Sequence, residues 1–351
     1  MPGRQRADVV VDRSLCRRCQ VNEPTITVRT EPLCAACFGK YVSTKIVKRM
    51  ESFRVRHAGA GNERLLLLPL SLGPCSMTLL HVLSQHLTVQ AEKSGRTGYR
   101  LHVLHVDDGE SEDATALIES VKQRYPEHVY STCLLSDALK LEGINELLDA
   151  DTDNSDALST VLGRLNSATS RDDMLQILLR KLVVNVAKQR NCEAIIWGDS
   201  TTRLAERTLA ETAKGRGFTL PSVMGDGESP HGVPYYYPMR DLLSKEIVAY
   251  ASQVDPSLDA IIRVDKAKPA VSTKNTTIDD LMRQYFESVE REYPSIVANV
   301  VRTTSKLQAI SLQEVERQCE LCDAPLQGHS PERSRLCYGC IRILPHATDT
   351  E

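Results

Sequence analysis

The chain has 351 residues, enough for two domains or for one large domain with appendages. Hydrophobic residues make up 41% and charged residues 25%, as in ordinary globular proteins, and the net charge of −3 excludes a uniformly basic surface. The longest apolar stretches are too short to span a membrane, and residues 1–14 lack the apolar core of a secretory signal. We therefore expect a cytoplasmic protein without membrane contact.

Eight of the eleven cysteines form two sets with the same spacing. Each set has a C-x2-C pair, fourteen further residues and a second C-x2-C pair. Four thiolates at this spacing can close a tetrahedral zinc site. Redox-active or disulfide-forming pairs are the alternative, which a thiol-reducing cytosol and the repeated spacing disfavour. We expect two zinc fingers, with the ligands Cys16, Cys19, Cys34 and Cys37 near one end of the chain and Cys319, Cys322, Cys337 and Cys340 near the other.

A basic segment, residues 40–57, follows the N-terminal finger and precedes a plausible linker at 58–63. The segment has few helix breakers, and Glu51 alone opposes its cations. A solvated helix face is the usual meaning of such a charge run. Contact with nucleic-acid phosphates is the second interpretation, which the neighbouring zinc module favours in an acidic protein. The candidate phosphate-binding residues are Lys45, Lys48, Arg49, Arg54 and Arg56.

Strand and helix patterns alternate between residues 64 and 265. This alternation predicts an α/β fold, a parallel sheet covered by helices on both faces. In such a sheet ligands bind beyond the carboxyl ends of the strands, where the loop 71–76 and the motifs HVDDG and WGDS all fall. A Gly/Pro-rich stretch at 215–234 is expected to be a long mobile loop. Strands are expected over 65–70, 99–109, 128–135 and 192–200, and helices over 76–90, 112–124, 171–191, 201–214 and 238–253.

The loop at 71–76 joins a strand to a helix, an arrangement that offers backbone N–H groups to a phosphate. Two of its residues are unsuited to that task. Leu72 places a side chain where a phosphate-binding loop needs glycine, and Pro74 removes an N–H group.

The strand–loop–helix unit, HVDDG, WGDS and PMRDLLSKEIVAYA occur in an order that resembles the PP-loop ATP pyrophosphatase family, which has an adenine nucleotide alpha hydrolase-like fold. That family holds the pyrophosphate of ATP with a loop of the form SGGxDS while it adenylates a substrate. Here leucine replaces the second glycine and cysteine replaces the acidic residue. The resemblance implies a degenerate nucleotide loop made of Ser71, Gly73, Cys75 and Ser76, with ATP not expected as a cofactor.

A zinc finger at each end of a PP-loop domain is similar to the layout of the tRNA 2-thiolation group. Catalytic members of that group carry a central C-x2-C after the third strand, but here Cys133 is followed three positions later by Ser136. Cys192 lies at the entrance to a strand, with no chemical role assigned. Because the phosphate loop is degraded and the cysteine pair is absent, no catalytic residue is expected. Small, inert, buried thiols are the favoured interpretation of Cys75, Cys133 and Cys192.

The resemblance implies a non-catalytic subunit of a heterodimer that replaces the 2-oxygen of the wobble uridine in tRNAs for Lys, Glu and Gln with sulfur. The sulfur would come from a thiocarboxylated ubiquitin-related modifier, the catalytic partner would bind ATP, and this chain would bind tRNA and support its partner. Two alternatives stay open. The chain could itself be an ATP-dependent tRNA thiolase, or it could be a zinc-based protein-interaction module.

Three regions are predicted along the chain. Residues 1–58 hold the N-terminal finger and basic helix, and residues 59–265 form the degenerate PP-loop domain. Residues 266–351 hold two further helices, at 277–292 and 294–310, and the C-terminal finger.

Overall fold

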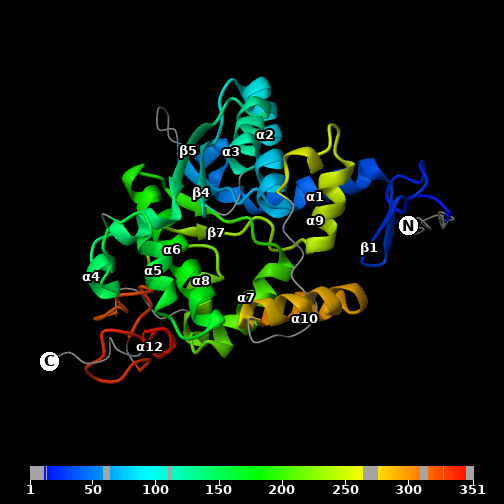
Figure 1. Ribbon diagram of the computed structural model, residues 1–351. Coiled ribbons are helices and arrows are strands. Elements are labelled where there is room, and N and C mark those ends of the chain that lie inside the picture. Colours follow the sequence, from blue (N-terminus) through cyan, green and yellow to red (C-terminus); the bar gives the residue numbers. More distant parts are fainter. Residues whose placement is uncertain are drawn as a thin grey trace.

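The computed structural model places an α/β body between two small cysteine-rich lobes (Figure 1). The N-terminal finger, with β1, projects at one side, and the C-terminal finger, with α12, lies at the opposite side. The linker predicted at 58–63 lies outside the described residues. These are residues 12, 14–57, 64–109, 113–152, 154–263, 276–308, 315–326 and 328–344.

The body is built on a five-stranded parallel sheet with the strand order β5-β4-β3-β6-β7, which confirms the predicted α/β class. β3 is central and pairs Leu65 with Arg100 of β4 and Leu66 with Ala194 of β6. Its unbroken leucine run is explained by burial on both faces. The strands are β3 Leu65–Pro69, β4 Arg100–Asp107, β5 Val129–Leu134, β6 Ala194–Ile196 and β7 Tyr235–Tyr236.

Helices cover the two faces of the sheet as separate layers (Figure 1). Leu66 and Leu68 pack into a core shared with α1, α2, α3 and α9, whereas Leu67 packs into a core shared with α6, α7, α10 and α11. These helices are α1 Ala35–Arg49, α2 Pro74–Ser94, α3 Ala114–Arg124, α6 Ala168–Gln189, α7 Thr201–Ala213, α9 Ser244–Gln253, α10 Ile278–Glu292 and α11 Pro294–Thr304.

Shorter elements complete the fold. β1 and β2 form an antiparallel hairpin inside the N-terminal finger, and 3-10 turns follow α1, β5, α7 and α9. Within the described residues no helix is long and apolar enough to cross a membrane. The short elements are β1 Ile26–Val28, β2 Glu31–Leu33, α4 Ile144–Leu148, α5 Ala157–Gly163, α8 Leu220–Val223, α12 Tyr338–Ile341 and the 3-10 turns Glu51–Phe53, Val55–His57, Leu135–Lys140, Gly217–Thr219 and Asp259–Ile261.

The Gly/Pro-rich stretch at 215–234 differs from the expected mobile loop, because it is packed and internally bonded. The Ser229 hydroxyl donates to the carbonyl of Val233 at 2.7 Å, and the Tyr237 hydroxyl donates to the carbonyl of Val223 at 2.5 Å. Ser229, Val233 and Tyr237 are all buried. The glycines mark turns in this connection, and the tyrosine that holds it comes from outside the stretch.

Candidate metal centres, nucleotide loop and basic segment

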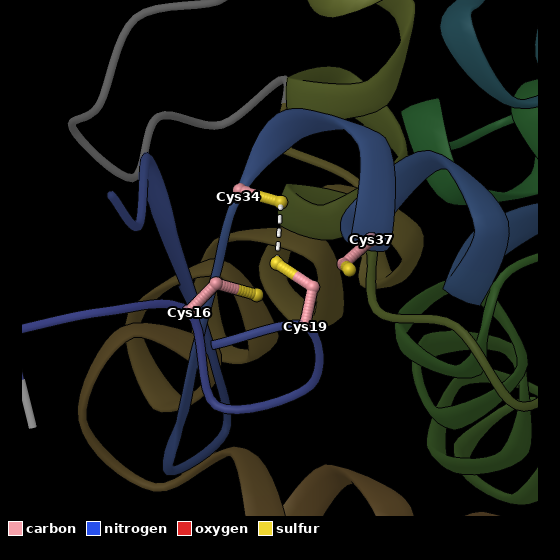
Figure 2. A group of neighbouring side chains, drawn as sticks. All are labelled: Cys16, Cys19, Cys34 and Cys37. Carbon is pink, nitrogen blue, oxygen red and sulfur yellow. Dashed lines mark hydrogen bonds between the residues drawn. The ribbon is translucent and has the colours of Figure 1, made fainter. Parts of the chain in front are cut away.

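The four cysteines of the N-terminal finger (residues 14–39) converge on one point (Figure 2). Their Sγ atoms lie within 4.8 Å of one another, and those of Cys19 and Cys34 are 3.8 Å apart. A tetrahedral zinc site with Zn–S bonds of about 2.3 Å separates its sulfurs by about 3.8 Å. Cys34 is the N-cap of α1 and Cys37 lies in its first turn, so the helix holds this pair. The set can bind a metal ion, with a geometry compatible with zinc.

The thiols of this cluster differ in pKa, and burial, followed by the neighbouring cysteines, raises the pKa of Cys37 to about 12. Burial raises the pKa of Cys16, but N–H groups of Cys19, Cys34 and Arg18 outweigh burial and lower that pKa to about 6. Asn22 also donates its side-chain N–H to the Sγ of Cys34 at 3.9 Å. Because metals bind the deprotonated thiol, the donors around Cys16 favour its ligating form.

The second cluster has the same shape in the C-terminal finger (residues 319–340). The four Sγ atoms again lie within 4.8 Å, with 3.7 Å between those of Cys322 and Cys337. Gly339 lies between the last two cysteines and packs against Lys214 and Arg216, which follow α7. A Cβ atom at position 339 would be 2.9 Å from the carbonyl oxygen of Lys214 and 2.6 Å from the Cγ of Arg216. Glycine therefore allows this finger to dock closely.

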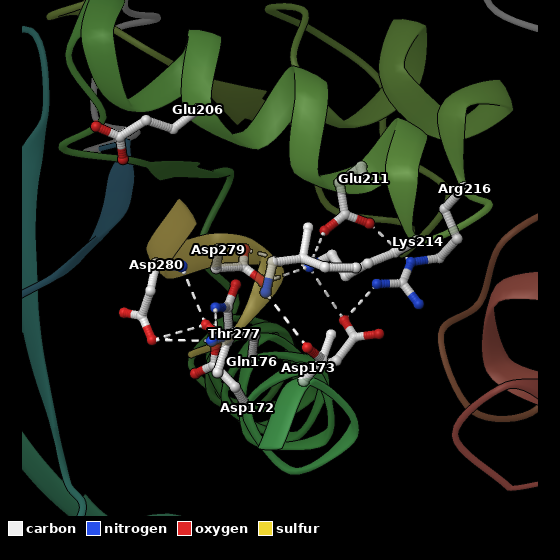
Figure 3. A network of polar contacts seen from close by, with 12 residues as sticks. Asp172, Asp173, Gln176, Glu206, Glu211, Lys214, Arg216, Thr277, Asp279 and Asp280 are labelled. Atoms are coloured by element: carbon white, nitrogen blue, oxygen red, sulfur yellow. Dashed lines mark hydrogen bonds and ion pairs between the residues drawn. The ribbon is translucent and has the colours of Figure 1, made fainter. Parts of the chain in front are cut away.

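A buried ionic network lies beneath that contact (Figure 3). The ammonium of Lys214 is fully buried, 2.9 Å from Glu211, 3.0 Å from Asp279 and 3.3 Å from Asp173. Arg216 and Arg342 both pair with the Asp173 carboxylate. Buried charges must be paired, and these pairs join α6, α7 and α10 to the chain that follows α12. The network fixes the C-terminal finger on the body.

The loop between β3 and α2 joins a strand to a helix through residues that are unsuited to phosphate binding. Leu72 has a φ of 63°, the left-handed conformation that glycine adopts most easily. Its side chain is completely buried and packs into the core of the α2 layer. Pro74 is the first residue of α2 and offers no N–H at the helix N-terminus.

The polar groups of this loop bind one another. The hydroxyls of Ser71 and Ser76 are 3.1 Å apart, and that of Ser76 also lies 3.2 Å from the carbonyl of Gly73. The carbonyl of Leu72 accepts the backbone N–H of Arg263 at 2.9 Å. Both hydroxyls of the loop are thus engaged within the chain.

The three motifs predicted to meet at the strand ends do so. A Cβ at Gly198 of WGDS would lie 3.1 Å from the Cα of Ser76, so that turn touches the start of α2. Arg263, which bonds to the loop, also lies 3.4 Å from Asp108 of HVDDG. Within WGDS, Asp199 forms an ion pair with Arg207 at 2.8 Å.

The three isolated cysteines are neutral thiols at physiological pH. Burial, followed by the nearby Asp199 carboxylate, raises the pKa of Cys75 to about 12. Burial raises the pKa values of Cys133 and Cys192 to about 11 each. A neutral thiol is a weak nucleophile. None of the three belongs to a possible metal cluster among the described residues.

The structure divides the five candidate tRNA-binding residues into two groups. Arg49 makes two bonds to Asp241, at 2.8 and 3.0 Å. Arg54 and Arg56 both pair with Glu51. Lys45 and Lys48 have no ion pair within the described part of the chain; Lys48 is exposed, and the ammonium of Lys45 lies 5.7 Å from the ring centre of Tyr41. The segment is helical only to Arg49, and two 3-10 turns follow.

The fold and these features define a PP-loop-like α/β protein with a four-cysteine cluster near each end. A solved structure of similar fold is the U34-tRNA thiolase NcsA from Methanococcus maripaludis with its 4Fe-4S cluster, at a TM-score of 0.61 and 15% identity over 96% of this chain and 97% of that one. A relative from Phaeosphaeria nodorum, named cytoplasmic tRNA 2-thiolation protein 2, is 42% identical over 98% of each chain. One of the same name from Pyrenophora tritici-repentis is 41% identical over 100% of this chain and 99% of its own.

A family model with the description "Cytoplasmic tRNA 2-thiolation protein 2" also matches residues 277–335. The chain belongs to the cytoplasmic tRNA 2-thiolation protein 2 family. The matched residues include α10, α11 and part of the C-terminal finger, which lie outside the PP-loop region.

Sequence reasoning missed the residues that tie these sites together. Arg263 bonds to the loop from 191 positions further along the chain, and Asp173 pairs with Arg342 across 169 positions. No local pattern reveals such partners. The signal that could have pointed to Gly339 is its place inside a C-x2-C knuckle, where a small residue lets a neighbouring backbone approach.

Proposed function

We propose that this chain is a non-catalytic subunit of a cytoplasmic heterodimer that 2-thiolates the wobble uridine of tRNAs for Lys, Glu and Gln. Two findings support a place in tRNA thiolation. The chain belongs to a family named for cytoplasmic tRNA 2-thiolation, and it shares its fold with a protein described as a U34-tRNA thiolase.

The state of the loop at 71–76 is the observation that carries the non-catalytic role. ATP activation needs free backbone donors and an acidic residue at a loop of this kind. Here Leu72 is buried in the core, Pro74 lacks an N–H, and Cys75 is a neutral thiol. The hydroxyls of Ser71 and Ser76 are already within hydrogen-bond distance of each other. ATP therefore binds to the partner subunit, which adenylates the uridine.

The contribution of this chain is to bind tRNA and to stabilise its catalytic partner. The basic segment at 40–57 supplies the tRNA contact through cations that attract phosphates. The sulfur comes from a thiocarboxylated ubiquitin-related modifier and passes to the activated uridine on the partner. None of the three isolated thiols of this chain takes part, since their raised pKa values keep them protonated.

One zinc ion in each four-cysteine cluster completes the proposal. Four thiolates fill a tetrahedral shell and leave no open position for water or substrate, which is typical of structural rather than catalytic zinc. The two ions would hold the knuckles of each finger together. That role fits a chain that provides a binding surface.

Reconstitution with the catalytic subunit tests this function. We would measure 2-thiouridine in tRNA Lys, Glu and Gln by mass spectrometry, with this chain alone, the partner alone and both together. The proposal predicts product only when both are present, and no pyrophosphate release by this chain alone. Pyrophosphate release and thiolation by this chain alone would establish the alternative of an active thiolase. Full thiolation by the partner alone would favour a separate zinc-based interaction module.

A further inference from the structure

Positive charge is concentrated at the N-terminal end of the described chain. Residues 14–57 contain nine Lys and Arg against three Glu, whereas the whole chain has 43 Lys and Arg against 46 Asp and Glu. Zinc with four thiolates would carry a net charge of about −2, which leaves this region positive. The finger stands out from the body in Figure 1, so the described part of the body does not cover its outer face.

Part of this charge is used to fix the segment on the body. Arg49 reaches Asp241, and it also lies 3.5 Å from Asp226. Arg54 and Arg56 share Glu51. A guanidinium already held by a carboxylate must give up that partner before it can bind a phosphate, so it contributes little to binding.

Five other cations have no ion pair among the described residues, and we call them the finger face. Arg17 lies inside the first C-x2-C knuckle, and Arg29 lies at the tip of the β1–β2 hairpin. Lys40 and Lys48 are exposed on α1, eight residues apart, which corresponds to about 12 Å along the helix axis. Lys45 is the fifth member of the set, lying beside Tyr41.

Tyr41 brings two cations of this region together, Arg18 and the finger-face residue Lys45. The guanidinium carbon of Arg18 lies 5.1 Å from its ring centre and the ammonium of Lys45 lies 5.7 Å from it, on or beside the finger face. Burial, followed by the Glu246 carboxylate, raises the pKa of Tyr41 to about 12, and the charges of Arg29 and Arg18 oppose this rise. The Glu246 and Asp241 carboxylates also act on this ring, and Arg18 pairs with Glu31 at 3.4 Å. The remaining excess of cations over carboxylates in residues 14–57 attracts a polyanion.

We infer that the finger face, Arg17, Arg29, Lys40, Lys45 and Lys48, is the surface that contacts the phosphate backbone of tRNA, and that Arg49, Arg54 and Arg56 are structural. This inference rests on the proposed tRNA-binding role and moves its centre from the basic segment onto the zinc finger. The finger becomes the platform that carries Arg17 and Arg29, and α1 carries the lysines.

A pair of matched double variants separates the two sets. R29N/K48Q removes two finger-face charges, and R54Q/R56Q removes two paired charges from the same region, so net charge changes equally. Arg29 has a φ of 58°, a conformation that Asn accepts more readily than Arg, so R29N is expected to preserve folding. Binding of tRNA to the complex is measured from 50 to 300 mM salt.

R29N/K48Q should weaken tRNA binding about tenfold at physiological salt and lower the slope of log Kd against log salt by about 1.5, because two phosphate contacts are lost. R54Q/R56Q should leave both quantities within about twofold of wild type. Equal effects of the two variants would overturn the inference, and so would loss of affinity with an unchanged slope. If the partner alone bound tRNA as tightly as the wild-type complex does, that result would instead refute the proposed tRNA-binding function.

Discussion

The side-chain oxygens of Ser71 and Ser76 lie 3.1 Å apart, so the first and last residues of the degenerate loop face each other. In a loop that grips a pyrophosphate, these hydroxyls and the intervening N–H groups would face the ligand. Here the two hydroxyls face each other, and the side chain of Leu72 is buried in the core. The backbone N–H of Arg263, 191 positions further along the chain, donates to the carbonyl of Leu72. These contacts hold the turn at the junction of β3 and α2.

Metal content gives the first prediction. Purified chain should contain two zinc ions, and C16S/C19S should contain one, since two thiolates cannot hold the N-terminal ion. Mass spectrometry of the intact metal-bound protein measures this directly. The same variant should unfold at lower temperature, because structural zinc contributes folding energy. Two zinc ions retained in C16S/C19S would disprove the N-terminal site.

Removal of the Asp173 carboxylate should be strongly destabilising. Asp173→Asn leaves Lys214, Arg216 and Arg342 short of a buried counter-charge, at a cost of about 3–5 kcal/mol in unfolding free energy. Urea denaturation measures the loss. Glu142→Gln, at an exposed carboxylate, is the matched control and should change stability by less than about 0.5 kcal/mol. Equal stability of the two variants would show that the network is not needed.

Gly339→Ala tests whether the close contact of the C-terminal finger requires glycine. The added Cβ would be 2.9 Å from the carbonyl oxygen of Lys214, so the finger must shift. We expect faster loss of zinc to a chelator and a lower melting temperature. Gly163→Ala, whose Cβ would meet nothing within 4 Å, serves as the control and should be neutral or slightly stabilising. Unchanged zinc release in Gly339→Ala would contradict this packing.

Stability should fall as pH decreases from about 6.5 to 4, partly because of His81. Burial, with a smaller contribution from Arg124, lowers the pKa of His81 to about 4. The unfolded chain therefore binds a proton in this range before the folded chain does, so stability rises with pH. His81→Gln should reduce the change in unfolding free energy between pH 6.5 and pH 4 by about 2 kcal/mol. An unchanged slope of unfolding free energy against pH would assign the effect to other histidines.

The sheet and the cysteine clusters could be predicted because their signals are local. A leucine run followed by a helix pattern predicts a buried central strand, and C-x2-C spacing predicts a metal-binding knuckle. Pairing between distant charges has no such signal. Arg49 binds Asp241, which is 192 positions away in the sequence. The sequence alone therefore grouped Arg49 with Lys45 and Lys48 as a candidate tRNA-binding residue.

Tertiary packing also explains why the stretch at 215–234 differs from the mobile loop that its composition predicts. The hydroxyl of Tyr237 donates to the carbonyl of Val223 in this stretch. The backbone N–H of Tyr237 also donates to the carboxylate of Asp226, at 2.8 Å. The division into regions 1–58, 59–265 and 266–351 stays a prediction.

The most direct test of the non-catalytic role is thiolation by the reconstituted heterodimer with a Cys75→Ala loop in this chain. Cys75 occupies the acidic position of active loops but is a neutral, half-buried thiol. The rate of 2-thiouridine formation should stay within about twofold of wild type, as expected for a group that takes no part in the transition state. The equivalent lesion in the partner's loop should abolish it. Loss of thiolation by Cys75→Ala in a folded, partner-bound chain would contradict the account and assign chemistry to this loop.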